Sequence, residues 1–275
     1  QDEIKKSFSW VDVVFGTQTI GDFPRLLNDR ISTGKKQFSI TANNSIVPDE
    51  KESKRLHKHK ALVNITYGCN NFCTYCIVPY TRGREKSRSL EDVVCEVKKL
   101  VADGAIEVML LGQNVNSFID DKGNTFPTLV RAINDIEGLE RIRFMTSNPK
   151  DLSDELIECY RTCEKLCKHI HLPVQSGSSS VLKRMNRRYD REKYIDIINK
   201  LKLACPDIAI TTDIIVGFPG ETEEKFLETY NFLAELPISY LHVFTYSERD
   251  NTEAVSMEGV VPISERKRRN KMLRI

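Results

Sequence analysis

Three cysteines stand close together in the segment Tyr67-Gly-Cys-Asn-Asn-Phe-Cys-Thr-Tyr-Cys76. They are Cys69, Cys73 and Cys76, in a C-x3-C-x2-C spacing that directly follows residues 61–66, whose apolar character predicts a buried strand. A loop at the end of a strand can bring three thiolates around one iron–sulfur cube, and the fourth iron then has no protein ligand and stays open to a small molecule. The spacing therefore predicts a [4Fe–4S] cluster held by these three cysteines.

A structural zinc site is the main rival interpretation. Zinc usually takes paired C-x2-C units with a matching second pair or histidines, and the sequence holds no such pair. Three further cysteines, Cys159, Cys163 and Cys167, are spaced by four. On a helix the outer two would lie about 12 Å apart at ~1.5 Å rise per residue, too far for one cube. We interpret them as core residues, together with Cys95 and Cys205.

Composition points to a globular chain with one large domain. The 275 residues are 40% hydrophobic, which is enough for a sizeable core, and no run approaches the ~18 apolar residues of a membrane span. The polar start lacks an apolar signal region. Eight cysteines without a disulfide pattern predict a reducing, cytoplasmic compartment. The net charge of +2 gives no evidence for a nucleic-acid partner. Evidence for such a partner would have to come from local basic patches.

A strand–helix alternation begins at residue 61. Apolar patterns predict helices around 90–101 and 226–236, and predict strands at 62–67, 106–112, 141–146, 168–174, 208–217 and 239–245. Strands joined through helices form parallel crossovers, so we expect an α/β fold, a partial (βα)6 TIM-like barrel. Chemistry in such barrels lies at the carboxyl ends of the strands.

The chain divides into four expected parts. Residues 1–30 contain a short strand at 11–16 and a helical turn at 23–27, residues 31–60 form a polar linker, residues 61–250 form the barrel, and residues 251–275 form an extension. A basic helix is predicted at 264–271 within that extension. Because the first residue is Gln1, we expect the chain to begin part-way through a longer protein.

Polar segments follow four of the predicted strands, at 112–114, 146–149, 175–178 and 217–222, and this agreement predicts one shared site. Gln113 and Asn114 favour a functional role. Two interpretations stay open for the glycine turn at 217–222: a tight connection with Thr222 as helix cap, or a ligand contact through free N–H groups. Ser178 is either a cap or a contact in the same way.

Charged and imidazole side chains near this site are also open to two interpretations. His169 and His171 alternate along a strand and are predicted to be hydrogen-bonded core residues. The basic runs Arg82–Arg88 and Arg187–Arg191 are either solvated faces or contacts to a phosphate or carboxylate.

Four segments together resemble the methylthiotransferase branch of the radical S-adenosylmethionine (SAM) enzymes, over roughly residues 60–250. They are 67–84, 110–116, 171–178 and 213–222. The resemblance implies a barrel of the radical SAM type, a [4Fe–4S] cluster on Cys69, Cys73 and Cys76, and SAM chelated to its open iron. It also implies that Tyr75 lies beside the adenine of SAM, with further contacts from Gln113, Ser176, Gly217 and Gly220.

The resemblance also implies a reaction. Segments 78–83 and 112–116 look most like MiaB-type members, which add a methylthio group to C2 of isopentenylated adenosine beside the tRNA anticodon. Segment 240–247 is more similar to relatives that act on threonylcarbamoyl-adenosine, and a ribosomal-protein aspartate is a third substrate in the family. The implied partners are the tRNA anticodon stem-loop and an electron donor such as a flavodoxin or ferredoxin. The alternative of another class is a non-catalytic metal-binding module that recognises RNA.

The chain departs from the family pattern at both ends. Members carry an N-terminal domain with three cysteines that hold an auxiliary, sulfur-supplying cluster. In this sequence no cysteine precedes Cys69. Residues 10–28 nevertheless resemble the end of that domain. Members also end in a small RNA-binding barrel, the TRAM domain, which the residues after 250 are too few to form. We therefore expect the catalytic core of a longer enzyme, with a second [4Fe–4S] cluster only in the full-length protein.

Overall fold

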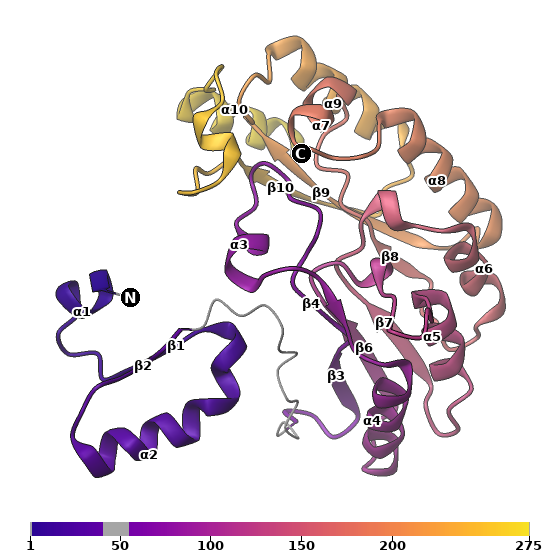
Figure 1. The fold of residues 1–275 in the computed structure, drawn as a ribbon. Coiled ribbons are helices and arrows are strands. Elements are labelled where there is room, and N and C mark those ends of the chain that lie inside the picture. Colours follow the sequence, from indigo (N-terminus) through magenta and orange to yellow (C-terminus); the bar gives the residue numbers. More distant parts are fainter. Residues whose placement is uncertain (1, 41–54, 275) are drawn as a thin grey trace.

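A curved parallel sheet with helices on its outer side forms the body of the molecule (Figure 1). The computed structural model describes residues 2–40 and 55–274. Hydrogen bonds join the strands in the orders β3-β6-β7 and β8-β9-β10, with every neighbouring pair parallel. Ile142 of β7 bridges Leu166, just before β8, and so connects the two sets. The strands are β3 (Lys60–Asn64), β6 (Glu107–Leu111), β7 (Arg141–Phe144), β8 (His169–His171), β9 (Ala209–Val216) and β10 (Tyr240–Thr245).

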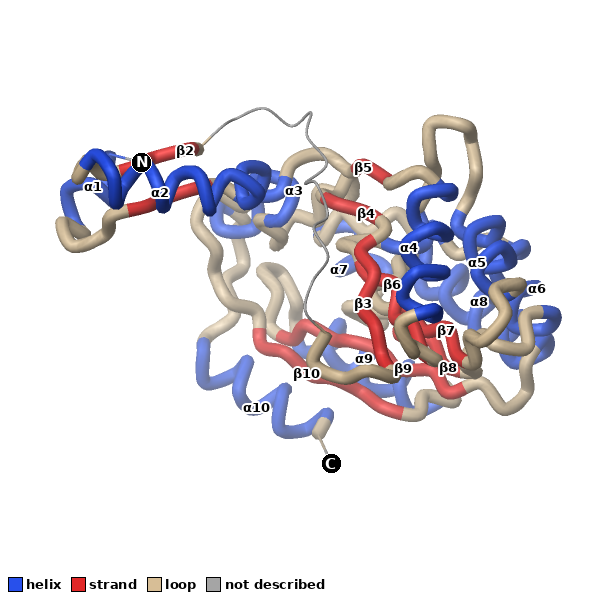
Figure 2. Tube along the Cα trace, turned by 90° about the horizontal axis from the view of Figure 1, so that it is seen from below, coloured by secondary structure: helices blue, strands red, loops and turns tan. Residues whose placement is uncertain are grey.

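This order confirms the predicted partial (βα)6 barrel. All six strands lie within the predicted ranges or within two residues of them. Each crossover carries helices, which gather outside the arc of strands (Figure 2). No helix in the described part of the chain combines the length and the apolar character that a membrane span needs. The main helices are α4 (Leu90–Ala102), α5 (Phe126–Asn134), α6 (Asp154–Thr162), α7 (Ser179–Arg184), α8 (Arg191–Ala204), α9 (Glu223–Glu235) and α10 (Ile263–Leu273).

Short polar caps determine where several helices begin. The side chain of Ser89 accepts a hydrogen bond from Asp92 N at 3.1 Å at the start of α4. Asp190 does the same for Lys193 N at 2.8 Å at the start of α8. Each such cap satisfies an N–H group that has no partner within the helix, and contributes about 1 kcal/mol. These capping residues therefore determine the sequence positions at which α4 and α8 begin.

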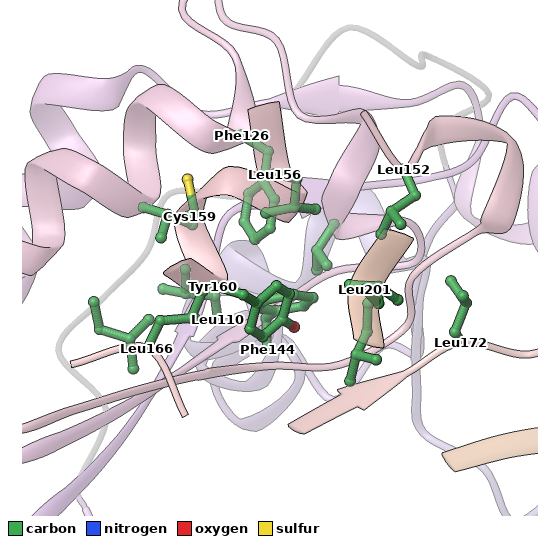
Figure 3. Packing of buried hydrophobic residues seen from close by; sticks show 14 of the residues in the cluster. Leu110, Phe126, Phe144, Leu152, Leu156, Cys159, Tyr160, Leu166, Leu172 and Leu201 are labelled. Carbon is green, nitrogen blue, oxygen red and sulfur yellow. The ribbon is translucent and has the colours of Figure 1, made fainter. Parts of the chain in front are cut away.

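The hydrophobic core lies between the strands and the outer helices. Residues alternate along β9, so that Ile210, Ile214 and Val216 point toward the helices and are fully buried. Phe126 of α5 packs edge-on against Phe144 of β7, with ring centroids 5.0 Å apart (Figure 3). Burying one such side chain stabilises the fold by about 1.5–3 kcal/mol.

The N-terminal residues form a small unit of their own. Strand β1 (Val13–Phe15) pairs in parallel with β2 (Gln37–Ser39), and the crossover between them contains η1 (Thr17–Asp22) and α2 (Phe23–Thr33). Helix α1 (Asp2–Ser7) precedes them. The linker predicted from residue 31 is therefore structured at its start, because the end of α2 and all of β2 lie there. Residues 41–54 of that predicted linker lie outside the described residues.

The C-terminal extension packs against the barrel. Helix α10 confirms the predicted basic helix and lies against β9 and β10. Two of its arginines are buried, because the side chains of Arg266 and Arg269 are only 4% and 5% exposed. Arg269 pairs with the buried Glu221 at 2.6 Å, and Arg266 pairs with Glu248 at 2.6 Å. These arginines hold α10 on the sheet.

Candidate metal centre

The cysteine loop begins at the carboxyl end of β3 and is closed by a short hairpin. β4 (Thr66–Tyr67) pairs antiparallel with β5 (Lys86–Ser87), and α3 (Val78–Arg82) lies between them. Gly68 has φ +70°, and a Cβ atom there would lie 2.3 Å from the carbonyl oxygen of Arg84. Only glycine fits this close approach. The next residue, Cys69, donates its N–H to Gly83 O at 3.1 Å, which fixes the start of the loop.

The three predicted ligands come together on this loop. Cys69 and Cys73 are each 9% exposed and Cys76 is partly exposed. Burial raises the pKa of the Cys69 thiol, and the charges of the nearby Cys73 and Cys76 raise it further. Burial also raises the pKa of the Cys76 thiol. The thiols are therefore close enough to influence one another in a site largely shielded from water.

The described side chains form no single-ion site of the kind that the rival zinc interpretation requires. Within residues 2–40 and 55–274, no group of three or more His, Cys, Asp or Glu side chains is arranged to hold one metal ion, as the rival zinc site requires. In a cube each cysteine binds a different iron, so its sulfur ligands lie farther apart than those of one ion. Cys69 and Cys73, which are buried, and Cys76, which is partly exposed, supply three thiols for such a donor set, and the binding of a cluster there stays a prediction.

A second loop holds the cysteine loop in place. Thr74 donates its N–H to Met185 O at 3.2 Å and its hydroxyl to Arg184 O at 3.0 Å. The side-chain amide of Asn186 donates to Phe72 O at 2.8 Å. Arg184 is the last residue of α7, Met185 and Asn186 directly follow it, and sequence reasoning did not assign these three residues to the site. An asparagine just after a helix commonly adopts a left-handed conformation, which was the one available signal.

The basic run after α7 contains two partly buried arginines and one exposed arginine. Arg187 Nη1 lies 3.4 Å from Cys73 Sγ, so this arginine belongs to the cysteine site. Arg191 lies over the Phe232 ring and pairs with Glu235 at 3.4 Å. Only Arg188 of the three is exposed. Of the two interpretations of this run, a solvated face or a phosphate contact, each applies to Arg188 alone, since Arg187 and Arg191 are held by contacts within the protein.

Of the predicted cofactor contacts, Tyr75 is part of the cysteine loop and Gln113 is hydrogen-bonded to it. The side chain of Gln113 accepts a hydrogen bond from Gly68 N at 2.6 Å, which joins the carboxyl end of β6 to the loop. Tyr75 packs edge-on against Phe218 of the glycine turn, with ring centroids 6.3 Å apart. The structure thus brings together the loop, the end of β6 and the end of β9.

The remaining predicted contacts have structural roles. The Ser176 hydroxyl is buried, lies 3.2 Å from Thr229 Oγ1 and accepts from Ser178 N at 3.2 Å. Gly217 and Gly220 have φ of +75° and +81°, and added Cβ atoms would approach the side chains of arginines on α10 and α7 to 2.3 and 2.8 Å. Contacts from these residues to a cofactor stay a prediction.

The structure shows which of the two predicted helix caps is formed. Thr222 accepts from Lys225 N at 3.4 Å and caps α9, as the structural interpretation predicted. Ser178 stands at the cap position of α7 but makes no side-chain cap hydrogen bond.

Two buried polar atoms at the ends of β6 and β7 belong to Asn114, which the sequence singled out, and to Ser147, which was predicted only as part of segment 146–149. Asn114 donates its amide to Asp151 Oδ2 at 2.7 Å, but its Oδ1 atom has no hydrogen-bond partner in the described part of the chain. Ser147 Oγ is also buried without a hydrogen-bond partner among the described residues. The nearby Glu85 accepts from Ser117 Oγ at 2.5 Å, and burial raises the pKa of its carboxyl group. Orphaned buried polar atoms at these strand ends are typical of a ligand site.

The other cysteines and the two histidines lie apart from the loop. Helix α6 ends at Thr162, so the predicted helical spacing of Cys159, Cys163 and Cys167 does not apply, yet the first two are buried as core residues. Cys205 is buried too, but Cys95 is exposed on α4, so its core assignment is wrong. His169 and His171 are hydrogen-bonded as predicted, both to Thr211 Oγ1, at 3.3 and 3.0 Å.

Comparison with known proteins agrees with this fold. A model of the radical SAM superfamily matches residues 63–233. A radical S-adenosylmethionine methyltransferase, TsrM, from Kitasatospora setae, solved with tryptophan substrate and a SAM analogue, superposes with a TM-score of 0.56 at 18% identity, covering 68% of this chain and 36% of that one. That likeness concerns the fold.

Closer relatives are known from their sequences. The chain is 53% identical, over 94% of its length, to a tRNA-2-methylthio-N(6)-dimethylallyladenosine synthase of Thermoanaerobacter sp. (strain X514). It is 50% identical, over 95% of its length, to the synthase of that name from Clostridium botulinum (strain Hall / ATCC 3502 / NCTC 13319 / Type A). These matches cover 56% and 58% of the relatives, so the chain spans about half the length of the curated relatives it matches.

Proposed function

This chain belongs to the radical SAM superfamily, and we propose that it is the catalytic core of a tRNA methylthiotransferase. The substrate we assign is adenosine with an N6-isopentenyl group, next to the anticodon, and the product carries a methylthio group at C2. The names of relatives at 53% and 50% identity support this assignment. The observation that carries it is that Cys69, Cys73 and Cys76 lie on one loop at the carboxyl ends of the strands of the partial barrel, and that a hydrogen bond from Asn186 holds this loop.

Different residues of the site would bind the cluster and SAM. Cys69, Cys73 and Cys76 would bind three irons of a [4Fe–4S] cluster and leave one iron for SAM. When bound, the cluster and SAM supply reductive cleavage of SAM to methionine and a 5′-deoxyadenosyl group that takes a hydrogen atom from the substrate. Asn114 Oδ1 and Ser147 Oγ, which lack partners among the described residues, are candidates to bind polar groups of SAM.

Five residues stay as SAM contacts in this proposal: Tyr75, Gln113, Ser176, Gly217 and Gly220. Tyr75 is the best supported of them, because it lies on the cysteine loop and packs against Phe218 of the glycine turn. Ser176 is the weakest, since its hydroxyl already meets Thr229 and Ser178.

The partners are a tRNA anticodon stem-loop and a small electron-transfer protein of the flavodoxin or ferredoxin kind, in the cytoplasm. Exposed cations beside the cysteine loop support contact with a polyanion. Arg82 and Arg84 are exposed there, and Arg84 lies 4.4 Å from the Phe72 ring centroid. The second cluster known for the family is proposed for the full-length protein alone.

Transfer of a hydrogen isotope tests this proposal at the first chemical step. The chain is reconstituted with iron and sulfide without oxygen, then mixed with SAM, dithionite and an anticodon stem-loop whose isopentenyl-adenosine is deuterated at C2. Mass spectrometry of the 5′-deoxyadenosine product should show incorporated deuterium. Matched stem-loops carry threonylcarbamoyl-adenosine or unmodified adenosine, also deuterated at C2.

The outcomes separate the alternatives. Deuterium from the isopentenylated substrate alone supports the assignment, whereas deuterium from the threonylcarbamoyl substrate alone assigns the chain to the other tRNA reaction. Abundant 5′-deoxyadenosine without deuterium from any of the three would contradict a reaction at C2 of adenosine. Failure of the protein to bind iron at all would favour the non-catalytic RNA-binding module.

A further inference from the structure

The guanidinium group of Arg187 is fixed by three hydrogen bonds from its three nitrogens. Nη1 donates to Cys73 Sγ at 3.4 Å, Nη2 donates to Pro173 O at 3.1 Å, and Nε donates to the Tyr189 hydroxyl at 2.8 Å. The group also lies 5.1 Å from the centroid of the Tyr189 ring. A planar guanidinium held at every nitrogen cannot turn toward solvent without losing these bonds. Its position beside Cys73 is therefore a built feature of the site.

The charge of Arg187 has no carboxylate partner. Within residues 2–40 and 55–274, its three hydrogen-bond acceptors are a thiol, a carbonyl and a phenol. The buried arginines of α10 are different, since Arg266 pairs with Glu248 and Arg269 pairs with Glu221. Arg187 is partly buried, and a cation that is partly removed from water is favoured by a nearby anion. The Cys73 sulfur lies next to the guanidinium group, at the position where an anion would compensate its charge.

A bound cluster would supply the missing negative charge. A cube held by three thiolates carries net negative charge, and accepting one electron from an external low-potential reductant makes it more negative. A nearby cation and an N–H···S hydrogen bond both stabilise the electron-rich state, and hydrogen bonds to sulfur are among the factors that set cluster potentials. An arginine at this position therefore favours reduction of the cluster.

We propose that Arg187 is a positioning residue that holds the Cys73 sulfur and raises the reduction potential of the cluster. This inference rests on the proposed function in one respect, the binding of a [4Fe–4S] cluster by Cys69, Cys73 and Cys76. It does not depend on the RNA substrate.

Redox titration of the reconstituted chain, followed by the electron paramagnetic resonance signal of the reduced cluster, tests the proposal. Arg187→Met removes the charge and the donor, Arg187→Gln removes the charge but keeps an amide donor, and Arg187→Lys keeps the charge without the planar fork. Arg188→Met is the matched control, because Arg188 is the exposed neighbour. Iron content and circular dichroism are measured for each variant.

The two neutral variants should shift the reduction equilibrium about tenfold toward the oxidised cluster. For a one-electron couple, this shift makes the reduction potential about 59 mV more negative. Arg187→Lys should lie between them and the wild type, and Arg188→Met should match the wild type. Folded neutral variants that fail to load iron, while Arg187→Lys loads it, would support the positioning role. Neutral variants with full iron content and an unchanged potential would overturn the proposal.

Failure of the proposed function has a different signature. If the wild-type chain takes up no cluster, the assignment of Cys69, Cys73 and Cys76 is wrong, and the role of Arg187 falls with it. If the wild type shows the cluster and the predicted potential shifts but no deuterium transfer, the role of Arg187 stands and the substrate assignment fails.

Discussion

The side-chain amide of Asn186 donates a hydrogen bond to the carbonyl oxygen of Phe72 at 2.8 Å, joining two segments that are 114 residues apart in sequence. Both residues have positive φ, 55° for Asn186 and 47° for Phe72. This contact fixes the middle of the cysteine loop, between Cys69 and Cys73. Placement of the thiols therefore depends on a loop that contains no cysteine.

Two substitutions at Asn186 separate the hydrogen bond from the backbone conformation. Asn186→Gly loses the bond but tolerates the left-handed conformation, and should lower the free energy of unfolding by about 1 kcal/mol. Asn186→Ala loses the bond and adds the strain of positive φ, about 1–2 kcal/mol more. Urea unfolding of the apoprotein measures both. Equal stability of Asn186→Gly and the wild type would show that the contact with Phe72 does not hold the loop.

The glycine turn after β9 should be sensitive to a single methyl group. A Cβ atom at Gly217 would lie 2.3 Å from Arg266 Cγ. Arg266 cannot easily move aside, because it donates to Tyr246 O and Val261 O, each at 2.8 Å. Gly217→Ala should therefore cost the strain of its φ of +75° plus about 1–3 kcal/mol for the clash.

Gly104→Ala is the matched control for that substitution. Gly104 also has positive φ, +91°, but nothing lies within 4 Å of an added Cβ atom. Thermal or urea unfolding should show a clearly larger loss of stability for Gly217→Ala than for Gly104→Ala. Similar losses would mean that the close approach of Arg266 does not require glycine at position 217.

Neighbouring arginines on α10 should differ sharply in their effect on stability. Arg269→Met leaves the buried carboxylate of Glu221 without its partner at 2.6 Å, and should lower the free energy of unfolding by about 3–5 kcal/mol at neutral pH. Arg268 pairs with Glu223 and Glu265 on the surface, so Arg268→Met should have a much smaller effect. Urea unfolding compares them, and equal losses would show that the buried pair does not hold α10.

Much of the fold could be predicted because each strand combines an apolar pattern with a polar end. The strands at 209–216 and 240–245 follow the predicted ranges within a residue. The role of Arg269 could not be predicted in this way. A run of like charges indicates a solvated face, and the sequence gives no sign that Glu221, 48 residues earlier, lies beneath that face.

The candidate site shows the same limit. The three thiols could be predicted because their spacing is local and specific to cluster ligands. Asn186 and Arg187 could not, since their contacts to Phe72 and Cys73 cross more than 110 residues and depend on how α7 ends. Cys95 was wrongly assigned to the core because its place on the helix was judged from residue type rather than from the exposed side of α4.

Stability should depend on pH through Asp120, whose carboxylate accepts hydrogen bonds from Leu90 N at 3.0 Å and from the Asn124 side chain at 2.9 Å. These bonds, led by that from Asn124, lower the pKa of Asp120 to about 2. The ionised form is therefore favoured by folding, so its contribution is complete above the unfolded-state pKa of about 3.9 and is lost as the pH falls toward 2.

Asp120→Asn removes this contribution. The variant should unfold at lower urea concentration than the wild type at pH 6, and the difference should shrink steadily between pH 4 and pH 2. A difference that stays constant across this range would contradict the lowered pKa.

The iron content of cysteine variants tests the central claim most directly. After anaerobic reconstitution, the wild-type chain should contain about four irons, one cube. Joint substitution of Cys69, Cys73 and Cys76 by alanine should abolish iron binding, while joint substitution of Cys159, Cys163 and Cys167 should leave it intact in folded protein. Loss of iron from the second variant, or retention of the full iron content by the first, would contradict the account.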